Sequence, residues 1–122
     1  PVWDFTISEK RVNSADILLQ HKTNWRELYE SEFAACGADE VVFLNERGEV
    51  AEGSRTNIFA QIDGRLRTPP LSGGLLNGCL RAEMLANDDC EEHVLMLNDL
   101  ARAEEIYLGN SLRGLIPAKL KR

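Results

Sequence analysis

The stretch from Glu40 to Ile62, EVVFLNERGEVAEGSRTNIFAQI, decides the fold because it predicts a run of short strands joined by tight turns. Glu40–Leu44 is a short apolar run typical of a strand, and Glu49–Ala51 resumes an extended pattern after the turn residues Asn45–Gly48. Thr56–Ile62 predicts a further strand. The middle of the chain is therefore expected to be a β-rich block.

The sequence on either side of this block adds further strands and helices. Val2–Ile7 alternates apolar and polar residues, which predicts a half-buried strand. Thr23–Ala35 has a helical pattern, with Asn24 as its N-cap and Gly37 as its stop. Beyond Ile62 the expected elements are a turn at Asp63–Gly64, a strand at Arg65–Thr68, a break at Pro69–Pro70, helices at Leu80–Ala86 and Asn98–Ala103, and strands at His93–Leu97 and Ile106–Leu108.

The bulk composition excludes several classes of function. The chain has 122 residues, which suits one domain, and a net charge of -6, which argues against a nucleic-acid or anionic-membrane partner. Its three cysteines, Cys36, Cys79 and Cys90, are scattered and lack the spacing of a zinc site, so we expect no metal and a reduced, cytoplasmic setting. The apolar runs are too short to cross a bilayer. The chain opens on strand-like residues without Met, as a piece of a longer polypeptide would.

The first segment that could carry chemistry contains Lys22, at the expected start of a helix after an apolar run. A lysine nucleophile reacts as the free amine, so its pKa must be lowered by desolvation or by a nearby cation. His21 and Arg26 could supply that positive field. The alternative is an ordinary solvated surface lysine, and this segment alone favours that alternative.

The second segment contains Glu52, at the end of a short strand and just before a Gly-Ser pair that permits a tight turn. A carboxylate in this position could pair with the protonated ring nitrogen of a cofactor. The alternative is a loop glutamate that faces water. The segment by itself does not decide between these two interpretations.

Two later segments could bind an anion. The glycine-containing loop before Leu80 leads into a helix, so the backbone amides of Cys79 and Leu80 could act as donors. Asn110 and Ser111 follow the last predicted strand, and Ser111 could offer a hydroxyl group and an amide to a phosphate. The alternatives are a plain glycine-rich connector and an ordinary turn.

In their order and spacing, these segments resemble the class IV aminotransferases, a family of pyridoxal-phosphate (PLP) enzymes. The resemblance rests on "HKTNWR", "LNERGEVAEGSRTNIF", "GRLRTPPLSGGLLNGCLR" and "AEEIYLGNSLRGLIPA". It implies that Lys22 bonds covalently to PLP, that Glu52 holds the pyridine nitrogen, and that the amides of Cys79 and Leu80 cradle the phosphate with Ser111. Asn110 and Arg26 are further candidates for cofactor contact. Many family members have Ile-Thr at the Cys79–Leu80 position, so a threonine hydroxyl contact is lost here.

The resemblance also implies a fold and a reaction. The expected fold is mixed α and β, a curved barrel-like sheet with outer helices and the cofactor site at its open edge, as in the C-terminal domain of D-amino-acid aminotransferase-like enzymes. Such enzymes are usually homodimers with an additional N-terminal domain, which is expected to be absent from residues 1–122. The "HKTxxR" start is closest to 4-amino-4-deoxychorismate lyases, including those fused to a synthase. The alternatives are a transaminase of branched-chain or D-amino acids and a non-catalytic dimerisation or scaffold domain.

Overall fold

The computed structural model describes residues 1–16 and 24–121, apart from the side chains of residues 24 and 25. The strands are β1 (Trp3–Ile7), β2 (Glu40–Leu44), β3 (Val50–Gly53), β4 (Asn57–Ile62), β5 (Arg65–Thr68), β6 (Glu91–Glu92), β7 (Glu105–Asn110) and β8 (Gly114–Leu120). The helices are α2 (Asn24–Cys36), α3 (Cys79–Ala86) and α4 (Leu97–Arg102), with short 3-10 turns η1 (Ser14–Asp16) and η2 (Leu71–Gly73).

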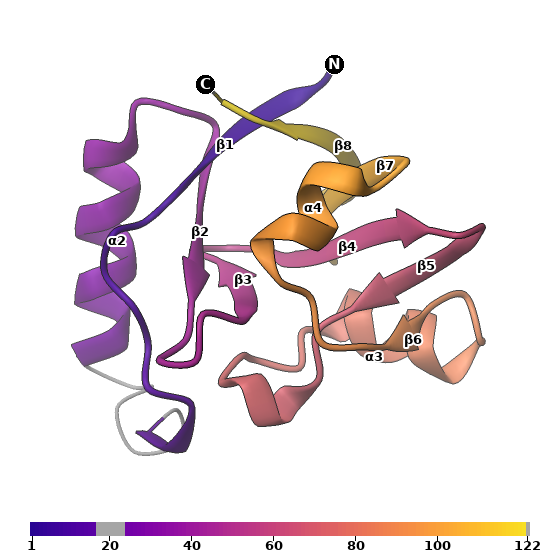
Figure 1. Cartoon of the computed structure of the whole chain (residues 1–122). Helices are drawn as coiled ribbons and strands as arrows, with labels where there is room; N and C mark the ends of the chain where they lie inside the picture. The colour runs from indigo at the N-terminus through magenta and orange to yellow at the C-terminus, as the bar shows by residue number, and fades with distance from the viewer. Residues whose placement is uncertain (17–23, 122) are drawn as a thin grey trace.

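The described strands form one sheet in the order β3-β2-β1-β8-β7-β4-β5-β6. Strand β1 is parallel to both of its neighbours, β2 and β8, whereas β7 is antiparallel to both β4 and β8. Strand β3 forms one edge of this order, yet it also lies against β4, to which the turn after Gly53 leads. The sheet is therefore strongly curled, as Figure 1 shows.

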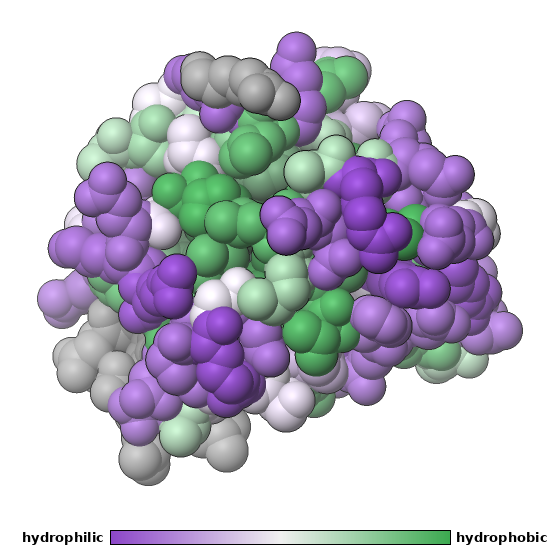
Figure 2. Space-filling view, in the orientation of Figure 1, coloured by the Kyte–Doolittle hydropathy of each residue, from purple (hydrophilic) through white to green (hydrophobic). Residues whose placement is uncertain are grey.

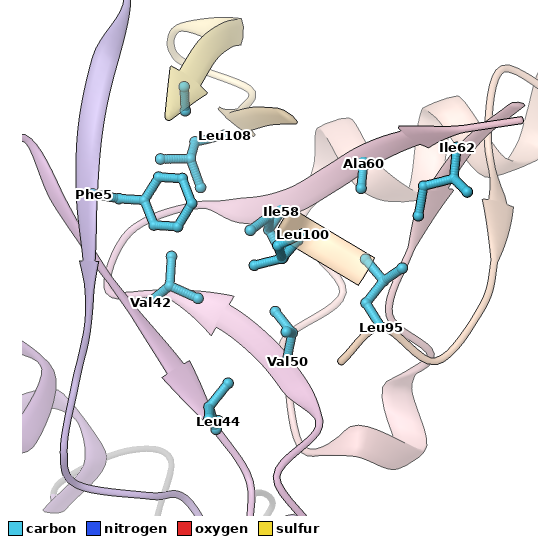
Figure 3. Packing of buried hydrophobic residues seen from close by; sticks show 11 residues of the cluster. Phe5, Val42, Leu44, Val50, Ile58, Ala60, Ile62, Leu95, Leu100 and Leu108 are labelled. Carbon is cyan, nitrogen blue, oxygen red and sulfur yellow. The ribbon is translucent and has the colours of Figure 1, made fainter. Parts of the chain in front are cut away.

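The curled sheet encloses the largest apolar cluster. Figure 3 shows side chains of β1 to β4 and β7 pointing toward one another, among them Phe5, Val42 and Ile58. Leu95 and Leu100, from the segment that contains α4, complete this cluster from its open side. Burial of large apolar side chains is the main stabilising term of such a core. Helix α4 therefore closes the interior of the sheet.

The other two helices cover the outer face of the sheet. Helix α2 packs Leu28, Tyr29 and Phe33 against a cluster that includes Phe43 of β2. Helix α3 and its surroundings pack against Phe59 of β4 in a separate cluster. These positions confirm the expected curved sheet with outer helices.

Most of the predicted elements are confirmed, and one is wrong. Helix α2 ends at Cys36 directly before Gly37, which has a left-handed φ of +66°. The strand predicted at His93–Leu97 does not exist, because only Glu91–Glu92 pairs with β5. The segment is held without a strand: Leu95 is fully buried in the core, and its carbonyl oxygen accepts a hydrogen bond from the Val50 amide at 2.8 Å.

Strand β8 was not predicted from the sequence, since Pro117 interrupts its apolar pattern. Proline has no amide hydrogen to donate to a neighbouring strand. Here Pro117 pairs with Tyr107 of β7, and the pairing with β1 begins one residue later, at Ala118. The proline is thus accommodated because it precedes the part of β8 that lies between two strands.

Figure 2 shows the face seen in Figure 1, with hydrophobic side chains gathered between α2 and α4 and hydrophilic side chains around them. Exposed apolar residues of the described chain include Val94, Met96 and Leu97, which precede or begin α4. Among the described residues, none of the helices has the length and apolar character needed to span a membrane.

Candidate functional site

A β-bulge directs Glu52 toward the outer face of the sheet. Phe43 of β2 pairs with Glu52, but the next residue, Leu44, pairs with Val50, so Ala51 is the extra residue in β3. Such a bulge re-aims the side chains that follow it. Phe43 faces α2, and Glu52 opposite it therefore projects toward the same helix.

The Glu52 carboxyl group is buried, with only 4% of the residue exposed. It accepts a hydrogen bond of 3.0 Å from the Tyr29 hydroxyl group and one of 3.1 Å from the Leu76 amide. Burial disfavours the charged form and raises the pKa of Glu52 to about 8, although both hydrogen bonds act in the opposite direction. The alternative of a loop glutamate facing water is therefore wrong.

Tyr29 is a site residue that the sequence did not reveal. Its position in the helical pattern of α2 is typical of a core side chain, and its ring stacks on Phe43 with the centroids 4.2 Å apart. Its hydroxyl group, however, reaches Glu52, and burial and the nearby carboxylates raise the pKa of Tyr29. The available signal was chemical: a buried tyrosine hydroxyl needs a hydrogen-bond partner.

The segment that donates to Glu52 leads directly to the first turn of α3. The Leu76 carbonyl accepts a 2.9 Å hydrogen bond from the Asn57 side chain on β4. At Gly78, a Cβ atom would lie 2.6 Å from Asn57 Oδ1, so a side chain would displace that amide group. Glycine therefore lets the chain pass close to β4 and begin α3 beside the buried carboxyl group.

The first turn of α3 presents free backbone donors. Gly78 is extended at the N-cap, with no side-chain capping bond, and its carbonyl oxygen accepts the amide of Ala82. Within the described residues, no acceptor is bonded to the amides of Cys79 and Leu80. Free donors and the positive end of a helix are the features that an anion site of the predicted kind would use.

A buried arginine fixes the loop that precedes this turn. Arg81 is only 1% exposed, and its guanidinium group donates to Asn77 Oδ1 at 2.9 Å and to the Pro69 carbonyl at 2.8 Å. It also forms an ion pair with Glu92 of β6. Both ends of the loop from Pro69 to Asn77 are thus attached to a single side chain of α3.

The turn between β7 and β8 lies next to the same end of α3. A Cβ atom at Gly109 would lie 3.0 Å from Leu80 Cδ2, which places the end of β7 against the first turn of the helix. Ser111 follows two residues later and is exposed. Asn110 donates to the Arg55 carbonyl at 3.0 Å and accepts from the Arg113 amide at 2.9 Å, so its side chain fixes this turn.

The structure thus brings together Glu52, the amides of Cys79 and Leu80, and the segment with Asn110 and Ser111. Lys22 and His21 lie outside the described residues, so their predicted roles remain predictions. Arg26 is described and lies exposed on the first turn of α2. No group of side chains suited to a metal ion occurs among the described residues.

The chain belongs to the class IV aminotransferase family: residues 4–120 match the family described as "Amino-transferase class IV". These enzymes depend on PLP. Because the match covers nearly the whole curled sheet and the segments around Glu52 and α3, it confirms the resemblance and the fold class expected from the sequence.

Three similar proteins illustrate the range of the family. The crystal structure of a putative amino-acid aminotransferase from Mesorhizobium loti is 49% identical in sequence, with a TM-score of 0.89 over 99% of this chain and 60% of its own. The PLP form of a branched-chain amino acid aminotransferase from Thermobaculum terrenum is 26% identical, with a TM-score of 0.79, over 100% of this chain and 44% of its own. A "Putative aminodeoxychorismate lyase" from Schizosaccharomyces pombe is 33% identical over 79 residues, 62% of this chain and 34% of that protein.

The chain spans about a third of the length of the curated relatives that it matches. The family nevertheless includes proteins named for two different reactions, transamination and lyase chemistry. Membership therefore defines the cofactor class of the family, whereas the reaction of the enzyme that contains this chain is a separate question.

The described residues fit PLP at both of its charged ends. Glu52 is a buried carboxyl group, and no basic side chain among the described residues pairs with it. This suits a ring nitrogen that carries a proton. The free amides of Cys79 and Leu80, beside a glycine that leaves room for no side chain, suit a phosphate. The Leu76 amide bonded to Glu52 and the free amides at Cys79 and Leu80 belong to one short backbone segment, from Leu76 to Leu80.

Proposed function

We propose that this chain is the PLP-binding domain of a lyase that converts 4-amino-4-deoxychorismate into 4-aminobenzoate and pyruvate. The observation that carries the cofactor assignment is the buried Glu52 carboxyl group, which is linked through Leu76 to the free amides at the start of α3. In this proposal Lys22 holds the cofactor, Glu52 contacts its ring, and Cys79, Leu80 and Ser111 contact its phosphate, with Asn110 and Arg26 nearby.

The proposed roles follow from the chemistry of each side chain. PLP, when bound, supplies an electron sink that stabilises negative charge at the substrate carbon next to nitrogen. Lys22 as a free amine removes and returns a proton at that carbon. Glu52, whose pKa is raised to about 8, can hand its own proton to a ring nitrogen and remain as the paired carboxylate. Tyr29 and the Leu76 amide keep that carboxylate in place.

The surrounding structure limits the access of water to this proton. Glu52 lies beneath Tyr29 and the loop from Pro69 to Asn77, which Arg81 holds in place. A charge-paired hydrogen bond is stronger in such a poorly solvated position than in water. We therefore propose that the Glu52 environment keeps the ring nitrogen protonated throughout the reaction.

The choice of a lyase rests on the "HKTNWR" segment and is supported by the similarity to the Schizosaccharomyces pombe protein. A second candidate is transamination of an amino acid, which is favoured by the 49% identity to the Mesorhizobium loti protein. The residues named above serve both reactions, because both begin with removal of the same proton. We propose that substrate choice depends on a second domain of the same enzyme and that the enzyme acts as a homodimer.

Mixing the protein with PLP tests the proposal. We expect a visible absorbance band from cofactor bound through Lys22, and we expect Lys22→Ala to abolish it. The enzyme that contains this chain is then assayed for 4-aminobenzoate release and, separately, for keto-acid-dependent transamination. Lack of a Lys22-dependent band would contradict PLP binding, and transamination without 4-aminobenzoate release would replace the lyase by the second candidate.

A further inference from the structure

A second buried carboxylate, Glu40, lies next to the site and has no part in the proposed chemistry. Glu40 begins β2, and no part of it is accessible to solvent. In the described part of the chain, no ion pair involves Glu40. A buried carboxylate that lacks a counter-charge must be stabilised by hydrogen bonds.

The donors to Glu40 come mainly from the turn that follows Glu52. Its Oε1 atom accepts from the Val41 amide at 2.9 Å and from the Ser54 hydroxyl group. Its Oε2 atom accepts from the Arg55 amide at 3.1 Å and from the Thr56 hydroxyl group at 2.9 Å. Three of these four bonds therefore hold residues 54–56.

The Glu40 carboxylate packs directly against the backbone of the turn at residues 53–56. At Gly53, a Cβ atom would lie 2.7 Å from Glu40 Oε2, so this position accepts no larger residue. The Gly53 amide donates to the Thr56 carbonyl at 2.8 Å, and the Ser54 amide donates to the Val41 carbonyl at 3.0 Å. The turn is thus closed around Glu40 and attached to β2.

The same turn connects the two halves of the cofactor site. It begins directly after Glu52 and ends at Asn57, whose side chain binds the Leu76 carbonyl ahead of α3. In its middle, the Arg55 carbonyl accepts a hydrogen bond from Asn110, next to Ser111. A shift of residues 54–56 would therefore move the predicted ring contact and the predicted phosphate contacts relative to each other.

We infer that Glu40 is a positioning residue that sets the distance between the ring-binding and phosphate-binding halves of the site through its hydrogen bonds to residues 54–56. The inference rests on the proposed binding of PLP to this chain. Glu40 itself contacts neither the cofactor nor the substrate. Its action is transmitted through the backbone of the turn, so its loss weakens cofactor binding more than an equally destabilising change elsewhere.

The first test is Glu40→Gln, which keeps the shape of the side chain but replaces one acceptor oxygen by a donor. We expect the Kd for PLP, measured by titration of the Lys22-dependent absorbance band, to rise about tenfold, as for one buried donor left unsatisfied. We also expect faster amide exchange at Arg55 without PLP. The control is Asp99→Asn, because Asp99 accepts the Met96 amide at 2.8 Å at the start of α4, on the inner side of the sheet.

A second pair of variants decides the question if Glu40→Gln does not fold. Thr56→Val removes a buried hydroxyl that donates to Glu40, and Thr68→Val removes a buried hydroxyl that donates to the Ile58 carbonyl at 2.8 Å. Both should lower the melting temperature, but only Thr56→Val should raise the Kd for PLP. Equal Kd values in the two threonine variants would overturn the inference and leave the proposed function intact. No Lys22-dependent band in the unmodified protein would overturn both.

Discussion

The hydroxyl group of Tyr29 on α2 donates a 3.0 Å hydrogen bond to Oε2 of Glu52 on β3. This bond joins the helix that follows Lys22 in the sequence to the strand that carries the buried carboxyl group. The helix and the strand belong to different layers of the fold, and the bulge at Ala51 makes their meeting possible.

The pKa of Glu52 predicts a specific dependence of stability on pH. Burial raises this pKa from 4.5 to about 8, so the folded chain binds a proton that the unfolded chain releases. The free energy of unfolding should therefore fall as pH rises from about 4.5 to about 8, by up to about 1.4 kcal/mol per pH unit. Thermal unfolding of the protein without PLP measures this slope, and Glu52→Gln should flatten it. A slope that persists in Glu52→Gln would assign the dependence to another group.

Replacing Tyr29 by Phe should raise the pKa of Glu52 further, because the hydroxyl group stabilises the charged carboxylate. The upper end of the pH range over which stability falls should move to higher pH. The free energy of unfolding should also fall by about 1 kcal/mol, as for one lost hydrogen bond. Tyr107→Phe on β7 is the control and should leave the pH profile unchanged. An unchanged profile in Tyr29→Phe would mean that the bond does not influence Glu52.

Gly78→Ala should destabilise the protein, since the new Cβ atom would meet Asn57 Oδ1 at 2.6 Å. The expected cost is about 1–3 kcal/mol, with a weaker affinity for PLP because the amides of Cys79 and Leu80 shift. Gly73→Ala in the same loop is the matched control. Its nearest contact would be 3.6 Å, and its stability should change by less than about 0.5 kcal/mol. Chemical denaturation gives the free energy of unfolding of both variants, and equal values would contradict the close approach of Gly78 to Asn57.

Arg81→Met should lower the free energy of unfolding by about 3 kcal/mol, because Asn77, the Pro69 carbonyl and Glu92 lose a buried donor. Arg65→Met provides the comparison. Arg65 pairs with Asp88 and Glu91, whose side chains are 87% and 44% exposed, and each such pair contributes less than about 1 kcal/mol. Urea denaturation of the two variants gives the difference, and similar losses would show that the burial of Arg81 contributes nothing.

Much of the fold was predictable because its signals are local. The turn at Asn45–Gly48, the stop at Gly37, the alternation in β1 and the strand composition of β4 depend on neighbouring residues alone. Glu52 and the first turn of α3 became candidates only through the order and spacing of several segments, since neither segment alone decided between a functional and a structural role. The strand predicted at His93–Leu97 was wrong because a short apolar run also occurs where a single leucine, Leu95, is buried in the core and its apolar neighbours are exposed.

The remaining features depend on contacts that no local pattern encodes. The partner of Tyr29 follows from the bulge at Ala51, which reverses the direction of Glu52. The burial of Glu40 depends on three donors from residues 54–56 that meet it only in the folded sheet. Strand β8 was not predicted because a proline is tolerated in it only in this register, in which the pairing with β1 begins after Pro117.

The place of β1 in the sheet has a kinetic consequence. Trp3 pairs with Ala118, so the hydrogen bonds between β1 and β8 close a loop that contains almost the whole chain. Contacts between residues so distant in sequence slow the search for the native state. We expect the hairpins of β4–β5 and β7–β8 to form early in refolding and the β1–β8 ladder to form last, as the rate-limiting step.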